Sequence, residues 1–91
     1  MPNDLTTAPA TTPLSDVPVG STVVVAALSR SSAALRRLGE MGLTPGCELR
    51  VVRVAPLGDP VEVSLRGYRL SLRKQDAADV ETVAPGDWPP A

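Results

Sequence analysis

The sequence predicts a mainly β protein in which five short strands form a small barrel, with one short α-helix inserted after the first strand. Short apolar segments rich in β-branched residues recur along the chain and are separated by turn residues. One hairpin alternates apolar and polar residues on both of its strands, and a single short segment has helical spacing. Strands and helices do not alternate, so there is no basis for a parallel sheet, and short antiparallel strands close most easily into a barrel.

Composition divides the 91-residue chain into one folded unit and two ends. Residues 1–17 are rich in proline and threonine and have only isolated leucines, so we expect a disordered leader. Residues 84–91 contain Trp88 among prolines and predict a C-terminal tail, in which Trp88 packs loosely or anchors a partner. The folded domain is therefore predicted at residues 18–83.

The first strand and the helix are predicted at the start of this domain. Thr22 to Leu28 contains a run of valines and favours a strand that is buried on both sides. Ala33 to Met41 favours a helix, and Ser31 or Ser32 can accept hydrogen bonds from its first free amides. The apolar residues that share one face of this helix are Leu35, Leu38 and Met41.

A turn connects the helix to the next strand. Gly42 stands where a helix needs a left-handed cap residue, and Pro45 and Gly46 fit the central positions of a type II turn. From Cys47 onward apolar and polar residues alternate, which predicts a half-buried strand. The alternation shifts by one residue at Val51-Val52, so we expect a β-bulge there.

The clearest pattern is a hairpin that joins Val61 to Leu65 with Tyr68 to Leu72 through a two-residue turn at Arg66-Gly67. This register places all six apolar side chains of the hairpin on one face, Tyr68 included. A slip of one residue would turn the whole apolar set toward water. The sequence therefore fixes the pairing of these two strands.

The remaining segments are a loop, a helical turn and a closing strand. Ala55 to Pro60 contains two prolines and a glycine, and Leu57 at its tip has no core partner evident in the sequence. Lys74 to Ala78 suits one helical turn, and Val80 to Val83 predicts a closing strand beside the first strand. Leu57 is either a plug at one end of the barrel or an exposed contact residue.

Charge is distributed unevenly along the chain, although its net value is −1. All nine cations lie between Arg30 and Lys74 together with four acids, which gives this segment a charge of +5. Such a segment is either a solvated arginine-rich surface or a contact for nucleic acid, anionic lipid or an acidic protein. Four cations gather around the hairpin, namely Arg66, Arg69, Arg73 and Lys74, but single-strand binders usually add aromatic residues that are nearly absent here.

The residue types argue against an enzyme and against a tight metal site. The chain has no histidine, which removes the commonest general base and metal ligand. Cys47 is the only cysteine and is expected to be a small core residue, so neither a disulfide nor a cysteine-based zinc site can form within the chain. Glu40 and Glu48 are interpreted as surface acids. No apolar run approaches the length of a membrane helix or a signal peptide, so we expect a soluble protein.

Three motifs in order carry a resemblance to a known family. They are Leu35-Arg-Arg-Leu-Gly-Glu-Met-Gly-Leu-Thr-Pro-Gly-Cys-Glu-Leu, Ala55-Pro-Leu-Gly-Asp-Pro and Arg66-Gly-Tyr-Arg-Leu-Ser-Leu-Arg-Lys. Over about Val17 to Val83 the chain resembles the FeoA family of bacterial ferrous-iron transport proteins. The resemblance implies an SH3-like barrel and a small cytoplasmic accessory to FeoB, a membrane permease with a cytosolic GTPase domain. The same module forms the C-terminal domain of some iron-dependent repressors, and family descriptions include transition-metal binding.

These observations predict a non-enzymatic cytoplasmic protein that binds the cytosolic part of a FeoB-type transporter and modulates ferrous iron uptake. It would be peripheral to the membrane through this partner, and it would require no cofactor, although weak binding of Fe2+ or another divalent metal stays open. The alternative is a basic barrel that binds nucleic acid, or a repressor-type module. The candidate contact residues are Leu43, Pro56, Leu57, Gly58 and Asp59. The candidate structural turn residues are Gly42, Pro45, Gly46 and Gly67.

Overall fold

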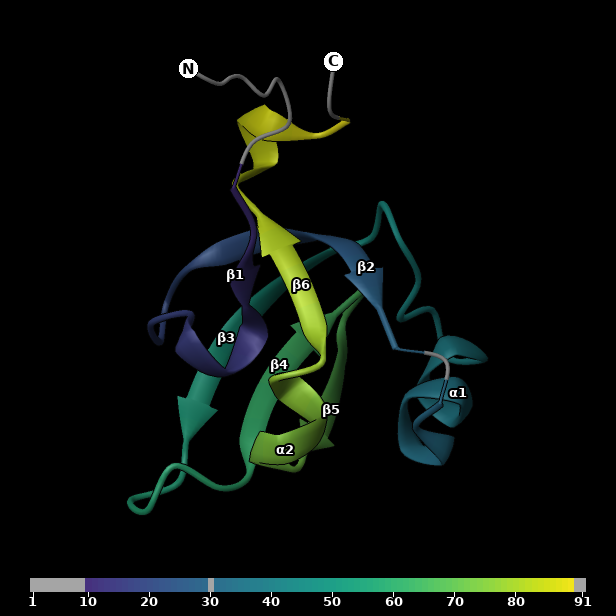
Figure 1. Cartoon of the computed structure of the whole chain (residues 1–91). Helices are drawn as coiled ribbons and strands as arrows, with labels where there is room; N and C mark the ends of the chain where they lie inside the picture. Colours follow the sequence, from purple (N-terminus) through teal and green to yellow (C-terminus); the bar gives the residue numbers. More distant parts are fainter. Residues whose placement is uncertain (1–9, 30, 90–91) are drawn as a thin grey trace, which may run out of the picture.

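Five segments rich in valine or leucine, together with the short segment Thr12–Pro13, form six antiparallel strands, which pair into one curved sheet in the order β1-β6-β2-β3-β4-β5 (Figure 1). This computed structural model describes residues 10–29 and 31–89. The elements are β1 (Thr12–Pro13), the 3-10 helix η2 (Leu14–Asp16), β2 (Thr22–Leu28), α1 (Ala33–Gly39), β3 (Glu48–Val54), β4 (Val61–Leu65), β5 (Tyr68–Leu72), α2 (Lys74–Ala77), β6 (Val80–Val83) and the 3-10 helix η3 (Pro85–Asp87). The predicted mainly β class is confirmed, and the predicted short helix follows the strand Thr22–Leu28, which is β2.

A sixth strand lies where the disordered leader was expected. Thr12 pairs with Thr82 of β6, and the Thr82 hydroxyl donates a hydrogen bond of 2.7 Å to the carbonyl oxygen of Thr12. The η2 turn then buries Leu14 completely and Val17 almost completely. The leader predicted to reach Val17 is therefore corrected, because two apolar side chains on one short turn fill the core. Residues 1–9 of that leader lie outside the described residues.

The strands β2 and β6 form as predicted. β2 has the predicted bounds, and β6 pairs with it from Val24 opposite Val83 to Leu28 opposite Val80. The register shifts between Val25 and Ala27, so the strand bends at its centre. β2 was expected to be buried on both sides along its length, but only Val24 and Val25 are buried. The other residues of β2 are partly or fully exposed.

The hairpin of β4 and β5 has the predicted register, from Val61 opposite Leu72 to Leu65 opposite Tyr68. Its turn residues have φ angles of 53° at Arg66 and 85° at Gly67, as a two-residue turn of the I′ type requires. Tyr68 is nevertheless 66% exposed, so its predicted place in the core is wrong. It pairs at the last rung beside the turn, where the core has already ended.

β3 alternates and bulges as its sequence indicates. Leu49 and Val51 are buried while Glu48 and Arg50 are exposed, and Cys47, immediately before the strand, is also buried. The register against β4 shifts between Val51 and Arg53, which confirms the bulge. The bend in β3 lets the three-stranded meander of β3, β4 and β5 curve around the core.

Helix α1 begins as predicted and ends earlier. The Ser32 side chain accepts a hydrogen bond of 3.1 Å from the Leu35 amide, which caps the helix. After Gly39 the chain tightens, because the Met41 amide bonds to the carbonyl of Leu38, three residues earlier. This turn directs Met41 outward at 51% exposure, so the predicted inward position of Met41 is wrong.

The reversal after α1 is fixed by a glycine. Gly42 has a φ of 112°, and the amide of the next residue, Leu43, donates to the carbonyl of Leu38 at 3.1 Å. These are the features of a Schellman-type helix end. The reversal brings Leu43, fully buried, into the same apolar cluster as Leu35.

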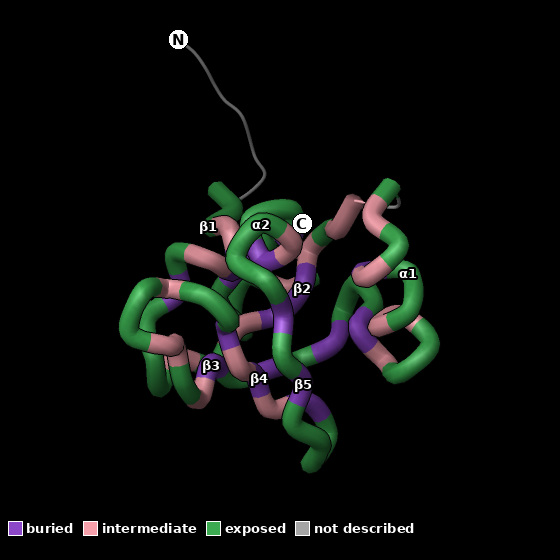
Figure 2. The backbone as a smooth tube through the Cα atoms, turned by 90° about the horizontal axis from the view of Figure 1, so that it is seen from below, coloured by how far each residue is buried: buried purple, intermediate pink, exposed green. Residues whose placement is uncertain are grey.

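One apolar core connects these elements (Figure 2). Its buried members are Leu14, Val17, Val25, Leu35, Leu43, Cys47, Leu49, Val51, Val61, Val63, Leu65, Leu70, Leu72, Ala77 and Val80. The cluster consists almost entirely of leucine and valine, so shape complementarity among aliphatic side chains has to hold the fold together.

The C-terminal segment packs more closely than the predicted tail. η3 forms one turn, and the half-buried Trp88 follows it. A Cβ atom built on Gly46 would lie 3.4 Å from Nε1 of Trp88, and Gly46 itself has a φ of 93°. The indole therefore lies over the backbone of the turn between α1 and β3, where a side chain would be both strained and crowded.

Replacing Leu14 with alanine is expected to destabilise the fold by about 2–5 kcal/mol, because it removes a fully buried leucine and leaves a cavity. Urea denaturation followed by far-UV circular dichroism measures this change. Leu57→Ala is the matched control, since a side chain that is 93% exposed should change the free energy of unfolding by less than about 0.5 kcal/mol. Equal midpoints for the two variants would contradict the burial of Leu14.

Candidate functional site

The loop between β3 and β4 carries four of the five predicted contact residues. Leu57 at its tip is 93% exposed, which excludes its alternative role as a plug at the end of the barrel. Pro56 and Asp59 are also exposed, and Gly58 is half-buried. The loop thus exposes an aliphatic side chain to solvent, which is unfavourable in free energy. A binding partner that covered this side chain would remove the unfavourable contact with water.

Hydrogen bonds hold this loop in one conformation. The Gly58 amide donates to the Ala55 carbonyl at 2.7 Å, and the Ala55 amide donates to the Pro60 carbonyl at 3.1 Å. The Asp59 carboxylate accepts a hydrogen bond of 3.0 Å from the Lys74 amide, at the first residue of α2. These hydrogen bonds hold the backbone around Leu57 in place. The loop would therefore lose little conformational entropy when a partner binds Leu57.

The fifth predicted contact residue, Leu43, lies elsewhere and is not accessible. It is fully buried beneath α1, which differs from its predicted role as a surface contact. Figure 1 shows α1 and the β3–β4 loop on opposite sides of the molecule. The structure therefore separates Leu43 from the loop residues rather than joining them in one site.

A groove that sequence reasoning missed lies above Leu43. It has a volume of about 430 Å³ and is mostly apolar, and we call it the α1 groove. Its lining residues are Leu28, Ser29, Leu35, Arg36, Gly39, Glu40, Leu43, Thr44 and Pro45. The end of β2, one face of α1 and the turn before β3 thus form an apolar concavity with charged residues among its lining.

Gly39 leaves one wall of the α1 groove open. A Cβ atom placed there would meet no other atom within 4 Å, so the packing of the protein does not require a glycine. A glycine within a helix costs roughly 1 kcal/mol relative to alanine. This unexplained glycine is the one sequence signal that pointed toward the groove, because a close approach by another molecule would account for it.

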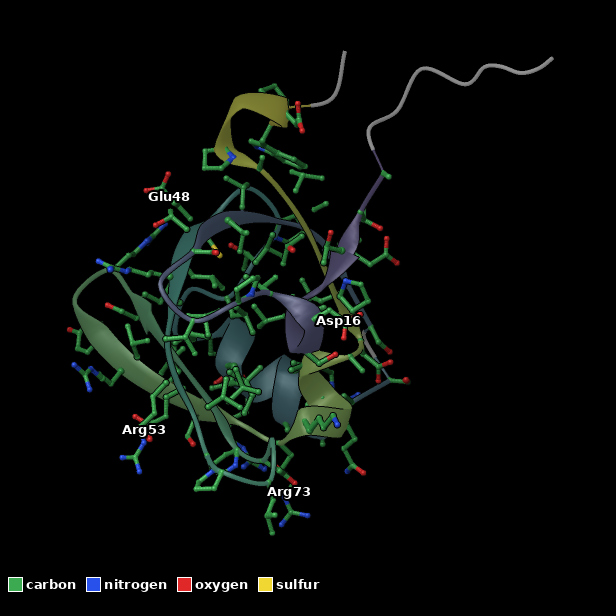
Figure 3. All side chains as sticks on the ribbon, turned by 90° about the vertical axis from the view of Figure 1, so that its left-hand side faces the viewer. Asp16, Glu48, Arg53 and Arg73 are labelled. Atoms are coloured by element: carbon green, nitrogen blue, oxygen red, sulfur yellow. The ribbon has the colours of Figure 1, made fainter. Side chains whose placement is uncertain are left out.

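The outer face of β3, β4 and β5 is basic. Arg50 lies opposite Ser64 of β4, and Ser64 lies opposite Arg69 of β5, so the two arginines stand on one face. Figure 3 shows Arg53 and Arg73 pointing outward near the β3–β4 loop. We call the set Arg50, Arg53, Arg69, Arg73 and Lys74 the basic surface; all five residues are exposed.

Cys47 is placed as a core residue. It is 6% exposed, and burial raises the pKa of its thiol, although the Thr44 backbone and the charge of Arg66 act in the opposite direction. The thiol is therefore protonated at neutral pH and is a poor nucleophile and metal ligand. Glu40 and Glu48 are exposed, as expected for surface acids.

No group of three or more histidine, cysteine, aspartate or glutamate residues is placed to hold a metal ion within residues 10–29 and 31–89. In the same part of the chain, no helix has the length and apolar character needed to cross a membrane. The surface features found among the described residues are the loop tip, the α1 groove and the basic surface.

Known proteins are similar to this chain in sequence and in fold. The FeoA domain model matches residues 12–83. A fusion of an Fe(2+) transport protein A with the Fe(2+) transporter FeoB, from Porphyromonas gingivalis, is 37% identical over 68 residues. That match covers 75% of this chain but only 8% of the fusion protein.

Two solved structures extend the comparison. A FeoA-like protein from Clostridium acetobutylicum superposes with a TM-score of 0.74 at 35% identity, over 85% of this chain and 90% of that one. FeoA from Stenotrophomonas maltophilia, solved with zinc and described as a procaryotic SH3 domain protein, gives 0.67 at 32% identity over 82% and 91% of the two chains. By the family match and these identities, the chain belongs to the FeoA family of ferrous iron transport.

Proposed function

We propose that this protein is a cytoplasmic accessory of ferrous iron uptake, which binds the cytosolic part of a FeoB-type transporter and modulates transport without catalysing a reaction. The observation that carries the proposal is the relative in which a FeoA-type domain and FeoB are parts of one chain. Domains that are fused in one organism often act on each other when they are separate, since the fusion raises their effective concentration. The exposed loop tip and the apolar α1 groove are features that a partner could bind, and they support an adaptor role.

The α1 groove is the surface that we assign to the transporter. Its occupant is an apolar segment of the cytosolic part of FeoB, which would cover Leu28 and the wall that Gly39 leaves open. Arg36 and Glu40 line the same groove and can set the orientation of that segment. The contact predicted at Pro56 to Asp59 stays a prediction.

Deletion of the gene is expected to reduce ferrous iron uptake several-fold in cells that depend on this transporter, because the accessory contact is lost. The measurement is uptake of radioactive iron under anaerobic conditions, with the tagged protein used in parallel to recover the transporter from detergent extracts. Complementation by the wild-type gene is the control. Unimpaired uptake in the deletion strain, together with no recovery of the transporter, would overturn the proposal.

Filling the α1 groove is expected to weaken transporter binding while the fold is preserved. Gly39→Leu places a side chain in open space and replaces a glycine within α1 with a better helix former, so its melting midpoint should be equal to or higher than that of the wild type. Its affinity for the purified cytosolic part of the transporter should fall at least about tenfold, since an apolar contact would be blocked.

Gly86→Leu is the matched control for this substitution. A Cβ atom added to Gly86 would also meet no other atom within 4 Å, and this glycine has no positive φ, but it lies in η3, away from the α1 groove. The affinity of this variant for the transporter should equal that of the wild type. Equal losses in both variants, or no loss in Gly39→Leu, would show that the transporter uses another surface.

We also propose that the adaptor role requires no resident metal. Binding at Cys47 would have to remove a proton from a thiol whose pKa burial has raised, which disfavours the thiolate at neutral pH. Anaerobic melting curves with ferrous iron and with EDTA are therefore expected to have the same midpoint. A metal present at a hundred times its dissociation constant would add about 2.7 kcal/mol of stability, so an upward shift that Cys47→Ala abolishes would contradict this proposal.

A further inference from the structure

We propose that the basic surface and the tip of the β3–β4 loop form a contact site for anionic lipid, so that the protein binds the membrane surface directly and not only through a protein partner. The inference uses the proposed function in one respect, namely that the protein works beside a membrane transporter. The contact itself is argued from charge, exposure and loop geometry.

Charge in the folded molecule is separated by strand. Residues 48–74, which contain β3, β4 and β5, carry six cations and three acids. Residues 10–29 and 75–89, which contain β1, β2 and β6, carry five acids and no lysine or arginine. The strands β3, β4 and β5 therefore carry a cationic side of the molecule, although its net charge is −1 and two further arginines, Arg36 and Arg37, lie apart in α1. A negatively charged plane would attract the molecule by the side that holds the larger number of cations.

The cations of the basic surface are available to an external partner. No ion pair with another described residue engages their side chains. Arg50 and Arg69 are separated by the one strand that contains Ser64, which places their Cα atoms about 10 Å apart. Such a spread of guanidinium groups suits an array of separate phosphates better than a single small anion.

The loop tip adds an apolar anchor beside these cations. Leu57 is 93% exposed on a braced loop, and the Lys74 Nζ atom lies 3.7 Å from the position that a Cβ on Gly58 would take. An aliphatic side chain flanked by cations is the pattern of a peripheral membrane contact. The leucine enters the boundary of the acyl chains while the lysine and arginine groups reach the phosphates.

Two nearby acids moderate the attraction without removing it. Glu62 lies opposite Arg53 on the outer face, and Asp59 precedes β4. The Asp59 carboxylate already accepts a hydrogen bond from the Lys74 amide, which ties it to the protein. Five cations against these two acids leave an excess of positive charge at the lipid contact.

An aliphatic side chain beside the cations favours lipid over nucleic acid as the partner. Binding of single strands draws on aromatic side chains that stack with bases, and the exposed Tyr68 lies at the opposite end of the hairpin from Leu57. The residue beside the cations at the loop is aliphatic. It can enter a bilayer, but it offers no stacking surface.

The test is co-sedimentation of the purified full-length protein with vesicles of phosphatidylcholine alone or with about 30% phosphatidylglycerol, at low ionic strength. The basic surface has a net charge of about +3, because its five cations lie near two acids. Each net positive charge near an anionic surface contributes roughly a fivefold gain in partitioning, so about a hundredfold preference for the anionic vesicles is expected. This preference should decline as salt is added. Equal partitioning to both vesicle types would overturn the proposal.

Paired substitutions separate the lipid site from general effects. Leu57→Ser should reduce binding to anionic vesicles roughly tenfold, and Arg50→Gln combined with Arg69→Gln should reduce it by more. The matched controls are Met41→Ser, an exposed apolar residue beyond α1, and Arg37→Gln, an exposed arginine within α1. Controls that lose as much binding as the site variants would contradict the assignment.

A third arm examines nucleic acid. A labelled single-stranded oligonucleotide that binds more tightly than the anionic vesicles, with no effect of Leu57→Ser, would replace the lipid proposal by the alternative of a nucleic-acid-binding barrel. The vesicle experiment contains no transporter. Its failure is therefore distinguishable from failure of the adaptor role, which is tested with Gly39→Leu and the transporter itself.

Discussion

The structure depends on covering a small aliphatic core from several sides with very short segments. Without phenylalanine, and with its single tyrosine exposed, the protein has no large buried ring, so each buried leucine contributes a large share of the core. η2 brings Leu14 to the core, and the reversal after α1 brings Leu43. Both segments are too short to be stable alone, and the apolar contacts that they make fix their positions.

This constraint explains which parts of the fold could be predicted from the sequence. The hairpin register, the cap at Ser32 and the bulge in β3 are decided by neighbours in the chain, so local patterns reveal them. Leu14 and Tyr68 depend on where the core ends in space. The first fills the core from a segment whose composition indicates disorder, and the second lies on the apolar face but beyond the core.

The same distinction applies to the surfaces. The exposure of Leu57 follows from a loop sequence that offers it no partner, whereas the α1 groove is assembled from three separate segments. The basic surface could be predicted from the sequence only in part. The hairpin register predicts that Ser64 and Arg69 lie together, but Arg50 joins them only through pairing of β3 with β4, and the bulge makes the register of that pair hard to infer.

The two assigned surfaces lie on different sides, and this arrangement has a consequence for affinity. A module that contacts the transporter through the α1 groove and lipid through the loop tip makes two weak contacts, and the first raises the effective concentration for the second. A covalent fusion such as that in Porphyromonas gingivalis supplies the same gain through a peptide linkage. A separate protein therefore needs a second contact more than a fused domain does. On these two proposals, the charge separation of the chain would hold the module beside the membrane and so raise its effective concentration at the transporter.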